Sequence, residues 1–498
     1  MNMGTNLEPS FRVLPDTCFE LFRAKSFSRM SRKQIYATLW ISLLCIFQSP
    51  MLIGQVSLLD TTFNPGTGAQ SGFVESMAIQ PDGKILICGN FRSFNGQPQS
   101  YIARLHTNGA VDTNFIANVS YWVRQMALQN DGKIVIGGFF TSAGGQSRNL
   151  VARLNSDGTL DTTFNPGTGG TGILGAGIDG NANPFVFATT IQPDGKIIIG
   201  GNFATYNGVN RRGIARLETN GVLDTSFVVG SGVNSWVRSL LILTNSQIMV
   251  AGWFTSYNNQ TFNRMVRLNP NGSADTNFHA YFGDQTAAYT MAPLPNGQLI
   301  VGGHTVNSNS VFQQEIVRLN TNGTYDTAFN TGGTGANEKV QSVVLQPDGK
   351  ILFGGNFNAY NGVSARSVAR LNADGSRDNT FRAAVDNWIW TVVLQPDGKV
   401  LICGGFSTVD GFPRSGIARL LSGPGPFVFN PRLLGNAFSV SVMTQSGKNY
   451  LLQYKNLLTE TNWISLPQTA GDGTVKTLTD SDPSALRRFY RILENDSE

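Results

Sequence analysis

The sequence predicts an all-β fold, a seven-bladed β-propeller with four-stranded blades, followed by a small C-terminal β-sandwich. The first observation is a repeated line, "LQPDGKILFGGNF" at 345–357, with near copies at 79–91, 191–203 and 394–406. The second is the motif Asp-x-x-Phe, which occurs seven times, mostly at intervals of about fifty residues. One unit of this size cannot bury both faces of its sheet, whereas copies arranged around an axis can.

Residues 1–54 read as a presequence that contains a signal peptide. A basic start runs into "IYATLWISLLCIF" at 35–47, which is typical of a secretory signal. The apolar stretch is too short for a membrane span, which needs about 20 residues. Met30 is a possible true start, because it gives a signal of ordinary length. We therefore expect a protein that is exported to the extracellular space, the cell surface or the periplasm, with no membrane span in the mature chain.

The charge distribution argues against a nucleic-acid partner. The formal net charge is +5, but residues 1–34 hold six basic and three acidic side chains. From Gln55 onward 31 basic residues face 29 acidic ones, so the mature chain is nearly neutral. A nucleic-acid-binding surface needs a basic patch.

Each repeat unit reads as four short strands, which we expect in the first unit at 73–80, 84–91, 101–106 and 110–115. Alternating apolar residues between turn signals favour strands, and no helical periodicity is present. The turn between the first two strands is Pro-Asp-Gly. Since proline cannot take a positive φ, this favours a three-residue turn that ends on a left-handed glycine.

The turn between the third and fourth strands predicts a cross-strand ion pair. In "LNPNGSAD" at 268–275, a three-residue loop that starts at Pro270 places Arg267 opposite Asp275. The same spacing of eight residues recurs in six units. The expected pairs include Arg104 with Asp112, Arg267 with Asp275, and Arg370 with Asp378.

The seventh arginine, Arg419, predicts how the ring closes. Eight residues after it stands Phe427 instead of an aspartate. Asp60 lies in "SLLDTTF" at 57–63, ahead of the first complete unit, and has no arginine strand of its own. We therefore expect Asp60 to pair with Arg419, so that the N-terminal strand completes the last blade and the propeller spans 55–421.

Two cysteines occupy the same strand position in the first and last units, Cys88 and Cys403. A ring would make these units neighbours. Equivalent positions of neighbouring units are expected to lie beyond the ~7 Å Cα separation that a disulfide allows. Two buried thiols are the expected outcome.

The repeat resembles a known family. "IQPDGKIIIGGNFATYNGVNRRGIARLETNGVLDTSF" at 191–227 is similar to the delta-60 repeat, a β-propeller repeat of secreted bacterial proteins. The resemblance covers roughly residues 55–421 and implies a propeller in an exported, often multidomain, protein. It implies no established activity and no catalytic residues.

A second domain follows the repeats. Residues 422–426 read as a linker, and 427–498 show alternating strands such as "FSVSV" and "YLLQY". This pattern predicts a small β-sandwich like those appended to secreted bacterial proteins. We expect a capping or attachment module whose Arg487, Arg488 and Arg491 lie on a solvated strand face.

The candidate binding residues lie where the first strand of each unit begins. This end gathers the variable loops, and strand alternation turns the side chains on either side of an apolar residue toward the central channel. The candidates are Phe73, Glu75, Trp122, Arg124, Phe185, Trp236, Arg238, Tyr289, Trp388 and Trp390. Two interpretations remain open: these residues plug the channel, or they form a rim that binds a glycan or an extracellular protein. We expect a monomer.

The alternative is a polysaccharide hydrolase or lyase. Catalysis would need paired carboxylates near the mouth. The candidates are Glu75, Asp179, Asp284, Glu338 and Asp386, and they share no spacing rule. The three histidines form no cluster, and no metal, phosphate or nucleophile motif is present. We therefore expect a non-catalytic protein without cofactor or metal.

Overall fold

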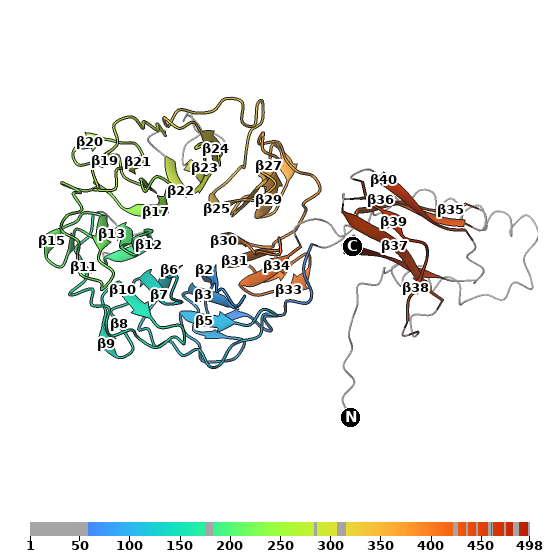
Figure 1. Cartoon of the computed structure of the whole chain (residues 1–498), viewed down its shortest axis with the longest axis horizontal. Coiled ribbons are helices and arrows are strands. Elements are labelled where there is room, and N and C mark those ends of the chain that lie inside the picture. Colours follow the sequence, from blue (N-terminus) through green and yellow to red (C-terminus); the bar gives the residue numbers. More distant parts are fainter. Residues whose placement is uncertain are drawn as a thin grey trace, which may run out of the picture. The chain divides into compact units, whose positions relative to one another are not determined.

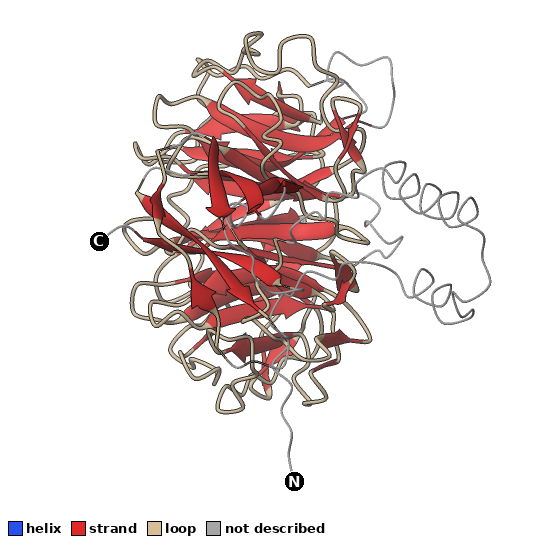
Figure 2. Cartoon of the chain, turned by 90° about the vertical axis from the view of Figure 1, so that its right-hand side faces the viewer, coloured by secondary structure: helices blue, strands red, loops and turns tan. Residues whose placement is uncertain are grey.

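The computed structural model describes residues 58–174, 183–282, 286–305 and 315–421, and parts of the C-terminal region: 427–434, 437–444, 447–456, 460, 462–472, 475–481 and 488–496. The chain divides into two compact units, and the described residues fall within Ser57–Gly423 and Pro424–Glu498. The predicted signal peptide and the predicted linker at 422–426 lie outside the described residues. Figure 2 shows strands and loops in the described part. No helix long and apolar enough to cross a membrane occurs among those residues.

In addition to small sheets of two-residue strands, seven three-stranded antiparallel sheets repeat along the chain among the described residues of Ser57–Gly423. Each sheet has an inner, a middle and an outer strand, and the sheets follow one another around a centre that the inner strands face (Figure 1). The strands, sheet by sheet, are β2 (Val74–Ile79), β3 (Ile85–Gly89), β5 (Ile102–Leu105); β6 (Val123–Leu128), β7 (Ile134–Gly138), β10 (Val151–Leu154); β12 (Phe185–Ile191), β13 (Ile197–Asn202), β16 (Ile214–Leu217); β17 (Val237–Ile242), β18 (Ile248–Gly252), β21 (Met265–Leu268); β22 (Thr286–Pro293), β23 (Leu299–Thr305), β24 (Ile316–Leu319); β25 (Val340–Leu345), β26 (Ile351–Gly355), β29 (Val368–Leu371); β30 (Ile389–Leu394), β31 (Val400–Gly404), β34 (Ile417–Leu420).

The hydrophobic cores lie between neighbouring sheets. The middle strand β3 reads "ILICG" and is buried at every position, because both of its faces meet other sheets. One core cluster joins Leu86 of the first sheet to Ile134 and Ile136 of the second. Each sheet therefore buries its apolar faces only by stacking on its neighbours, which is why the sequence repeats.

Both predicted turns are present. Gly83, the last residue of the first Pro-Asp-Gly turn, has a φ of 81°, and its N–H donates to the Gln80 carbonyl over 2.9 Å. In the other turn, the Asn269 N–H donates to the Ser273 carbonyl over 2.8 Å, and Leu268 pairs with Ala274.

The fourth strand of each blade is much shorter than the sequence suggests. The expected strand at 110–115 makes a single bridge, Leu105 with Val111, before the chain turns at Asp112. The Asp112 side chain stabilises the turn that ends the strand through its two carboxylate oxygens. One accepts the Asn114 N–H over 3.1 Å and the other accepts Arg104 Nε over 2.9 Å.

Small hairpins, which were not predicted from the sequence, stand between the middle and outer strands. They pair β8 (Ser142–Ala143) with β9 (Gln146–Ser147), β14 (Thr205–Tyr206) with β15 (Val209–Asn210), β19 (Ser256–Tyr257) with β20 (Gln260–Thr261), β27 (Ala359–Tyr360) with β28 (Val363–Ser364), and β32 (Thr408–Val409) with β33 (Phe412–Pro413). In the first sheet β1 (Ala69–Gln70) pairs with β4 (Ser93–Phe94), and β11 (Gly170–Thr171) pairs with β14.

The residues of the Arg-Leu and Asp-x-x-Phe motifs form one cluster in every repeat. Arg267 Nε lies 2.8 Å from Asp275 Oδ2, and the guanidinium sits over the Phe278 ring at 4.8 Å. Its Nη1 donates to the Thr321 carbonyl of the following unit over 2.7 Å. The remaining pairs, 2.7–2.9 Å apart, are Arg104–Asp112, Arg153–Asp161, Arg216–Asp224, Arg318–Asp326, Arg370–Asp378 and Arg419–Asp60.

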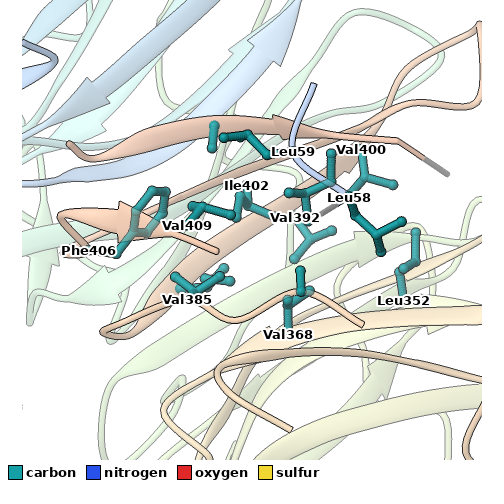
Figure 3. Packing of buried hydrophobic residues seen from close by; sticks show 14 of the residues in the cluster. Leu58, Leu59, Leu352, Val368, Val385, Val392, Val400, Ile402, Phe406 and Val409 are labelled. Atoms are coloured by element: carbon teal, nitrogen blue, oxygen red, sulfur yellow. The ribbon is translucent and has the colours of Figure 1, made fainter. Parts of the chain in front are cut away.

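The N-terminal segment lies in the last sheet. Leu59 bridges Leu420, and Asp60 receives Arg419 Nε over 2.8 Å. Figure 3 shows Leu58 and Leu59 packed among residues of β30 and β31 and the loops that follow, including Val392, Val400 and Ile402. On its other side the last sheet meets the first, since β30 and β31 both contact β2.

Cys88 and Cys403 are free, fully buried thiols on β3 and β31. Burial raises the pKa of both thiols, so neither is poised to react. This is the expected outcome.

The C-terminal unit contains two sheets within its described residues. One has the order β35 (Phe427–Leu434), β36 (Ala437–Met443), β40 (Val475–Asp480); the other joins β38 (Ile464–Ser465), β39 (Thr469–Ala470) and β41 (Phe489–Asp496) to β37 (Lys448–Lys455). Val440 and Leu452, one from each sheet, share a small core. The assignment as a β-sandwich module stays a prediction.

The expected solvated arginine face is wrong for Arg488. Its side chain is only 8% exposed, contacts Asp480 and lies 4.0 Å from the centre of the Tyr454 ring. Arg491 is partly buried, with Nε donating to Gln453 Oε1 over 2.7 Å. Charged heads on this strand are therefore satisfied within the unit. Arg487 lies outside the described residues.

Candidate functional site

The candidate site is built by a β-bulge that recurs at the start of every inner strand. In the first sheet Val74 pairs with Gly89 and Ser76 pairs with Cys88, which leaves Glu75 as an extra residue. The same register shift occurs in the other six sheets. A bulge re-aims the side chain of its extra residue. The seven bulge residues are Glu75, Arg124, Phe187, Arg238, Tyr289, Gln341 and Trp390.

The bulge also accounts for a glycine in the repeated line. A Cβ on Gly89 would stand 2.1 Å from the Phe73 carbonyl oxygen, and a Cβ on Gly355 would stand 2.0 Å from that of Lys339. The backbone of the bulged strand thus approaches the middle strand too closely for any side chain. The second glycine of "GG" in the repeat therefore marks the site.

The bulge residues meet across the channel and fill it. The Arg124 guanidinium contacts the Glu75 carboxylate and lies over the rings of Phe187 and Trp390, at 4.0 and 4.6 Å. Arg238, from the fourth sheet, lies 4.6 Å from the same Phe187 ring. Contacts between residues of different, non-adjacent sheets place this group at the axis. We call the seven bulge residues the inner tier.

Three further contacts hold the inner tier. Trp122 Nε1 donates to Glu75 Oε2 over 2.6 Å. The Arg238 guanidinium donates to the amide oxygen of Gln341 and lies 4.0 Å from the Tyr289 ring centre.

Burial dominates the electrostatics of this tier. It raises the pKa of Glu75, although the charge of Arg124 and the hydrogen bond from Trp122 oppose the shift. Burial, with the nearby charge of Arg124, lowers the pKa of Arg238 to about 9. The inner tier holds two guanidiniums and one carboxylate, so its formal charge is positive.

A second, outer tier of residues stands two positions before each bulge residue, at the mouth of the channel. It consists of Phe73, Trp122, Phe185, Trp236, Ala287, Lys339 and Trp388. The ends of three middle strands add Phe139, Trp253 and His304, whose neighbours in the sheet are Trp122, Trp236 and Ala287.

The aromatic rings of the outer tier form an almost continuous arc. Phe139 stacks between Trp122 and Phe185, at 4.8 Å from each ring. Trp236 continues the arc to Trp253 at 6.0 Å. On the opposite side Phe73 contacts Trp122 at 6.1 Å and Trp388 at 6.4 Å.

The sixth sheet interrupts the arc with polar side chains. Glu338 Oε1 lies 3.6 Å from His304 Nδ1 and 4.0 Å from Lys339 Nζ. Burial, with the charge of Lys339, lowers the pKa of His304, so the ring is neutral near pH 7. The mouth thus has an aromatic wall and one polar gap.

Exposure varies within both tiers. In the outer tier Trp388 is 38% exposed and Phe185 is 1% exposed, and in the inner tier Arg124 and Phe187 are 7% and 5% exposed. A cavity of about 140 Å³ lies between the tiers, lined by Phe73, Glu75, Trp122, Arg124, Phe139, Arg238 and Trp390. Trp388 is the outer-tier residue that is exposed to solvent. The plug and the binding rim stay alternative predictions.

All ten sequence candidates lie in this site. The sequence analysis did not single out Phe139, Trp253 and His304. Each of the three directly follows the last glycine of the repeated line, in "GGF", "AGW" and "GGH". That position is the sequence signal for these residues. Among the carboxylate candidates Glu75 is in the inner tier, and Asp386 is exposed and accepts the Ser407 N–H over 2.9 Å. Asp179 and Asp284 lie outside the described residues.

Small sheets arranged around an axis, each stacked on its neighbours and each sending a bulged inner strand to a central channel, define a β-propeller. The chain belongs to the family described as "Domain of unknown function (DUF5122) beta-propeller", which is of the delta-60 repeat type. The family matches residues 80–115, 129–164, 192–227, 245–278, 294–329, 346–381 and 395–423.

Several solved structures are similar to this chain. The extracellular domain of the putative hybrid two-component system BT4673 from B. thetaiotaomicron is 12% identical, with a TM-score of 0.45 over 78% of this chain and 45% of that one. The WD40 β-propeller domain of Doa1 is 13% identical, with a TM-score of 0.41 over 71% and 93%. The gluconolactonase XC5397 from Xanthomonas campestris is 11% identical, with a TM-score of 0.33 over 71% and 97%.

The chain spans about half the length of the BT4673 domains that it matches, 45% and 54%. At TM-scores this low the likeness implies nothing about what this chain binds. No curated protein matches the sequence.

Proposed function

We propose that this protein is an exported, non-catalytic interaction scaffold that binds a glycan at the outer tier of its channel mouth, with an extracellular protein as the other candidate partner. One observation carries the proposal: the outer tier is an arc of contacting aromatic rings that ends in the exposed Trp388. Indole and phenyl faces offer large apolar area at little cost in conformational entropy. A flat aromatic wall on a rigid frame is suited to stacking on sugar rings.

The scaffold would be a closed, seven-bladed propeller. The family match supports this, because six matches end at the phenylalanine of an Asp-x-x-Phe motif and the seventh ends at 423 without one. The missing motif is at 60–63, where Asp60 pairs with Arg419. A ring closed in this way leaves no free end to pair with a second copy, which supports a monomer.

The contacts of the Glu75 carboxylate favour a binding role over catalysis. Its carboxylate is held by Arg124 and by the Trp122 N–H, beneath the aromatic arc. Glycoside hydrolysis needs two carboxyl groups about 5–10 Å apart on either side of the scissile bond. The inner tier holds a single carboxylate among its seven described residues, so a hydrolase or lyase is the weaker alternative.

Export rests on the sequence of the presequence at 1–54 and on the kind of family to which the repeats belong. The basic start and the short apolar stretch are typical of a secretory signal peptide.

The test is a tryptophan-fluorescence titration of residues 55–498 with a panel of soluble polysaccharides. We expect a saturable shift with at least one of them, and about a tenfold weaker affinity in Trp388→Ala, because one stacking face is lost. Trp463→Ala, in the C-terminal unit, is the matched control and should bind normally. If no polysaccharide binds, or if both variants bind equally well, the glycan site is excluded. Release of reducing ends by the wild type but not by Glu75→Gln would show the enzyme instead.

A further inference from the structure

The charge of the inner tier restricts what can bind above it. Glu75 is matched by Arg124, whereas the hydrogen-bond partner of Arg238 is the neutral amide of Gln341. A partly buried guanidinium with a neutral partner is costly unless an anion approaches it. Rings of Tyr289 and Phe187 compensate part of that cost from either side.

Both guanidiniums border the cavity between the tiers. Arg124 and Arg238 lie over the shared rings of Phe187 and Trp390 and both line the cavity of about 140 Å³. Its other walls are four aromatic side chains and the Glu75 carboxylate. Because Glu75 is paired with Arg124, Arg238 is the cation of the cavity that has no carboxylate partner. The cavity has room for a small substituent rather than for a whole sugar ring.

A further donor lies at the same place. The indole N–H of Trp390 is buried and has no hydrogen-bond partner among the described residues, and Trp390 lines the cavity. A buried donor without an acceptor costs free energy, which a ligand acceptor would recover. Two guanidiniums and one indole N–H form a set of donors suited to a carboxylate, since guanidinium geometry matches that group.

We propose that the ligand is an acidic glycan, whose uronate carboxylate enters the cavity beside Arg238 and Arg124 while its sugar rings stack on the outer tier. This rests on the proposed function and names the chemical class of its ligand. The aromatic arc favours a sugar over an acidic peptide as the source of the carboxylate, because several contiguous rings match the repeated faces of a polysaccharide.

The experiment compares two ligands with the same backbone, polygalacturonate and its fully methyl-esterified form, by titration calorimetry with residues 55–498. We expect the acid to bind at least about tenfold more tightly than the ester, which corresponds to hydrogen bonds with a charged group. The preference should shrink as salt is added, since the attraction is partly screened. Glucuronan and alginate, which carry the same carboxylate on other sugars, are titrated in parallel.

Arg238→Met should lower the ratio of the affinities for the acid and the ester to about one. Arg366→Met removes an exposed arginine and should retain the preference. The wild-type comparison remains decisive even if Arg238→Met fails to fold.

The failures of the two proposals are distinguishable. Equal affinity for acid and ester would overturn the acidic-glycan inference and leave the glycan scaffold intact. Binding of polyglutamate in place of every uronate polymer would overturn the assignment to a glycan. Absence of binding to any of these polymers, acidic or neutral, would overturn both proposals.

Discussion

Glu75 occupies a position where a carboxylate is hard to keep charged. Its side chain is 2% exposed, and that of its partner Arg124 is 6% exposed. Removing one member of a buried ion pair leaves the other charge without compensation. We therefore expect Glu75→Gln to lower the free energy of unfolding by about 3 kcal/mol, measured by urea denaturation followed by circular dichroism.

Two further variants test whether stability is lost because the Glu75–Arg124 ion pair is broken or because a carboxylate is removed. Glu338→Gln removes a carboxylate of the exposed polar gap and should change stability by less than about 0.5 kcal/mol. Adding Arg124→Met to Glu75→Gln should recover most of the loss, because the guanidinium that Glu75 paired with is then absent as well. Equal stabilities of the Glu75 and Glu338 variants would show that the pair contributes nothing.

Strand alternation predicted the ten candidate residues, although the structure places them with a β-bulge at the start of each inner strand. Alternation alone would place Glu75 and Ser76 on opposite faces, and the bulge changes this. A bulge leaves only a weak mark in a sequence, because it depends on the pairing partner. The glycine that faces it, Gly89 in the first unit, is the one residue type that the bulge dictates.

At the scale of the element, an aspartate holds the arginine of the outer strand, and in Arg267 the same guanidinium also donates to a carbonyl of the next repeat. Burial by itself would raise the pKa of Asp378, but hydrogen bonds from Thr380 and Lys350 and the charge of Arg370 outweigh it and lower that pKa to about 2. The pKa values of the other six motif aspartates are also lowered. Their hydrogen bonds favour the carboxylate in every unit.

This coupling predicts acid sensitivity. A carboxylate with a lowered pKa in the folded state stabilises the protein above its unfolded pKa, about 4, and this contribution disappears as the pH falls through the folded pKa. We expect the melting temperature to be steady from pH 7 to 5 and to fall steeply between pH 4 and about 2. Thermal melts at stepped pH values measure this.

Asp378→Asn provides the internal check. Its deficit in stability relative to the wild type should be full at pH 7 and should shrink toward zero near pH 2, because the wild-type carboxyl is then protonated as well. A deficit that stays constant across this range would mean that Asp378 acts through packing, not charge.

Turn chemistry and ion-pair spacing were readable at this scale because each follows from local geometry. The Pro-Asp-Gly turn and the Arg267–Asp275 pair need only the fixed length of one loop. The small hairpins were missed although their signal was present. Asn207 and Gly208 have φ values of 51° and 73°, the conformation that an Asn-Gly hairpin turn favours. That dipeptide in "TYNGVN" indicates the hairpin directly.

At the scale of the whole molecule, one exception to the repeated pattern predicted that the two ends of the repeat array meet. Six arginines find an aspartate eight residues later, and only Arg419 does not. Because Asp60 is the one motif aspartate without an upstream arginine, pairing the two requires the ends of the repeat array to meet. Which aromatic rings are exposed could not be predicted in this way, because their exposure depends on contacts among sheets that are far apart in the sequence.

The N-terminal segment should therefore stabilise the whole ring and not only its last sheet. A chain that begins at Asn64 lacks Leu58, Leu59 and Phe63, which are 1%, 5% and 0% exposed. Each buried apolar side chain contributes about 1.5–3 kcal/mol, so we expect a loss of about 5 kcal/mol or more. A chain that begins at Gln55 keeps the segment and is the matched control.

Hydrogen exchange distinguishes a closed ring from an open array of repeats. In a closed ring the truncation frees both sides of the seam, so protection should fall in β30 and β31 and also in β2 and β3, which belong to the opposite end of the sequence. In an open array each repeat depends only on its neighbours in the sequence, and the change would be confined to the last sheet. Exchange that is faster in β31 alone, with β3 as protected as in the control, would refute closure of the ring.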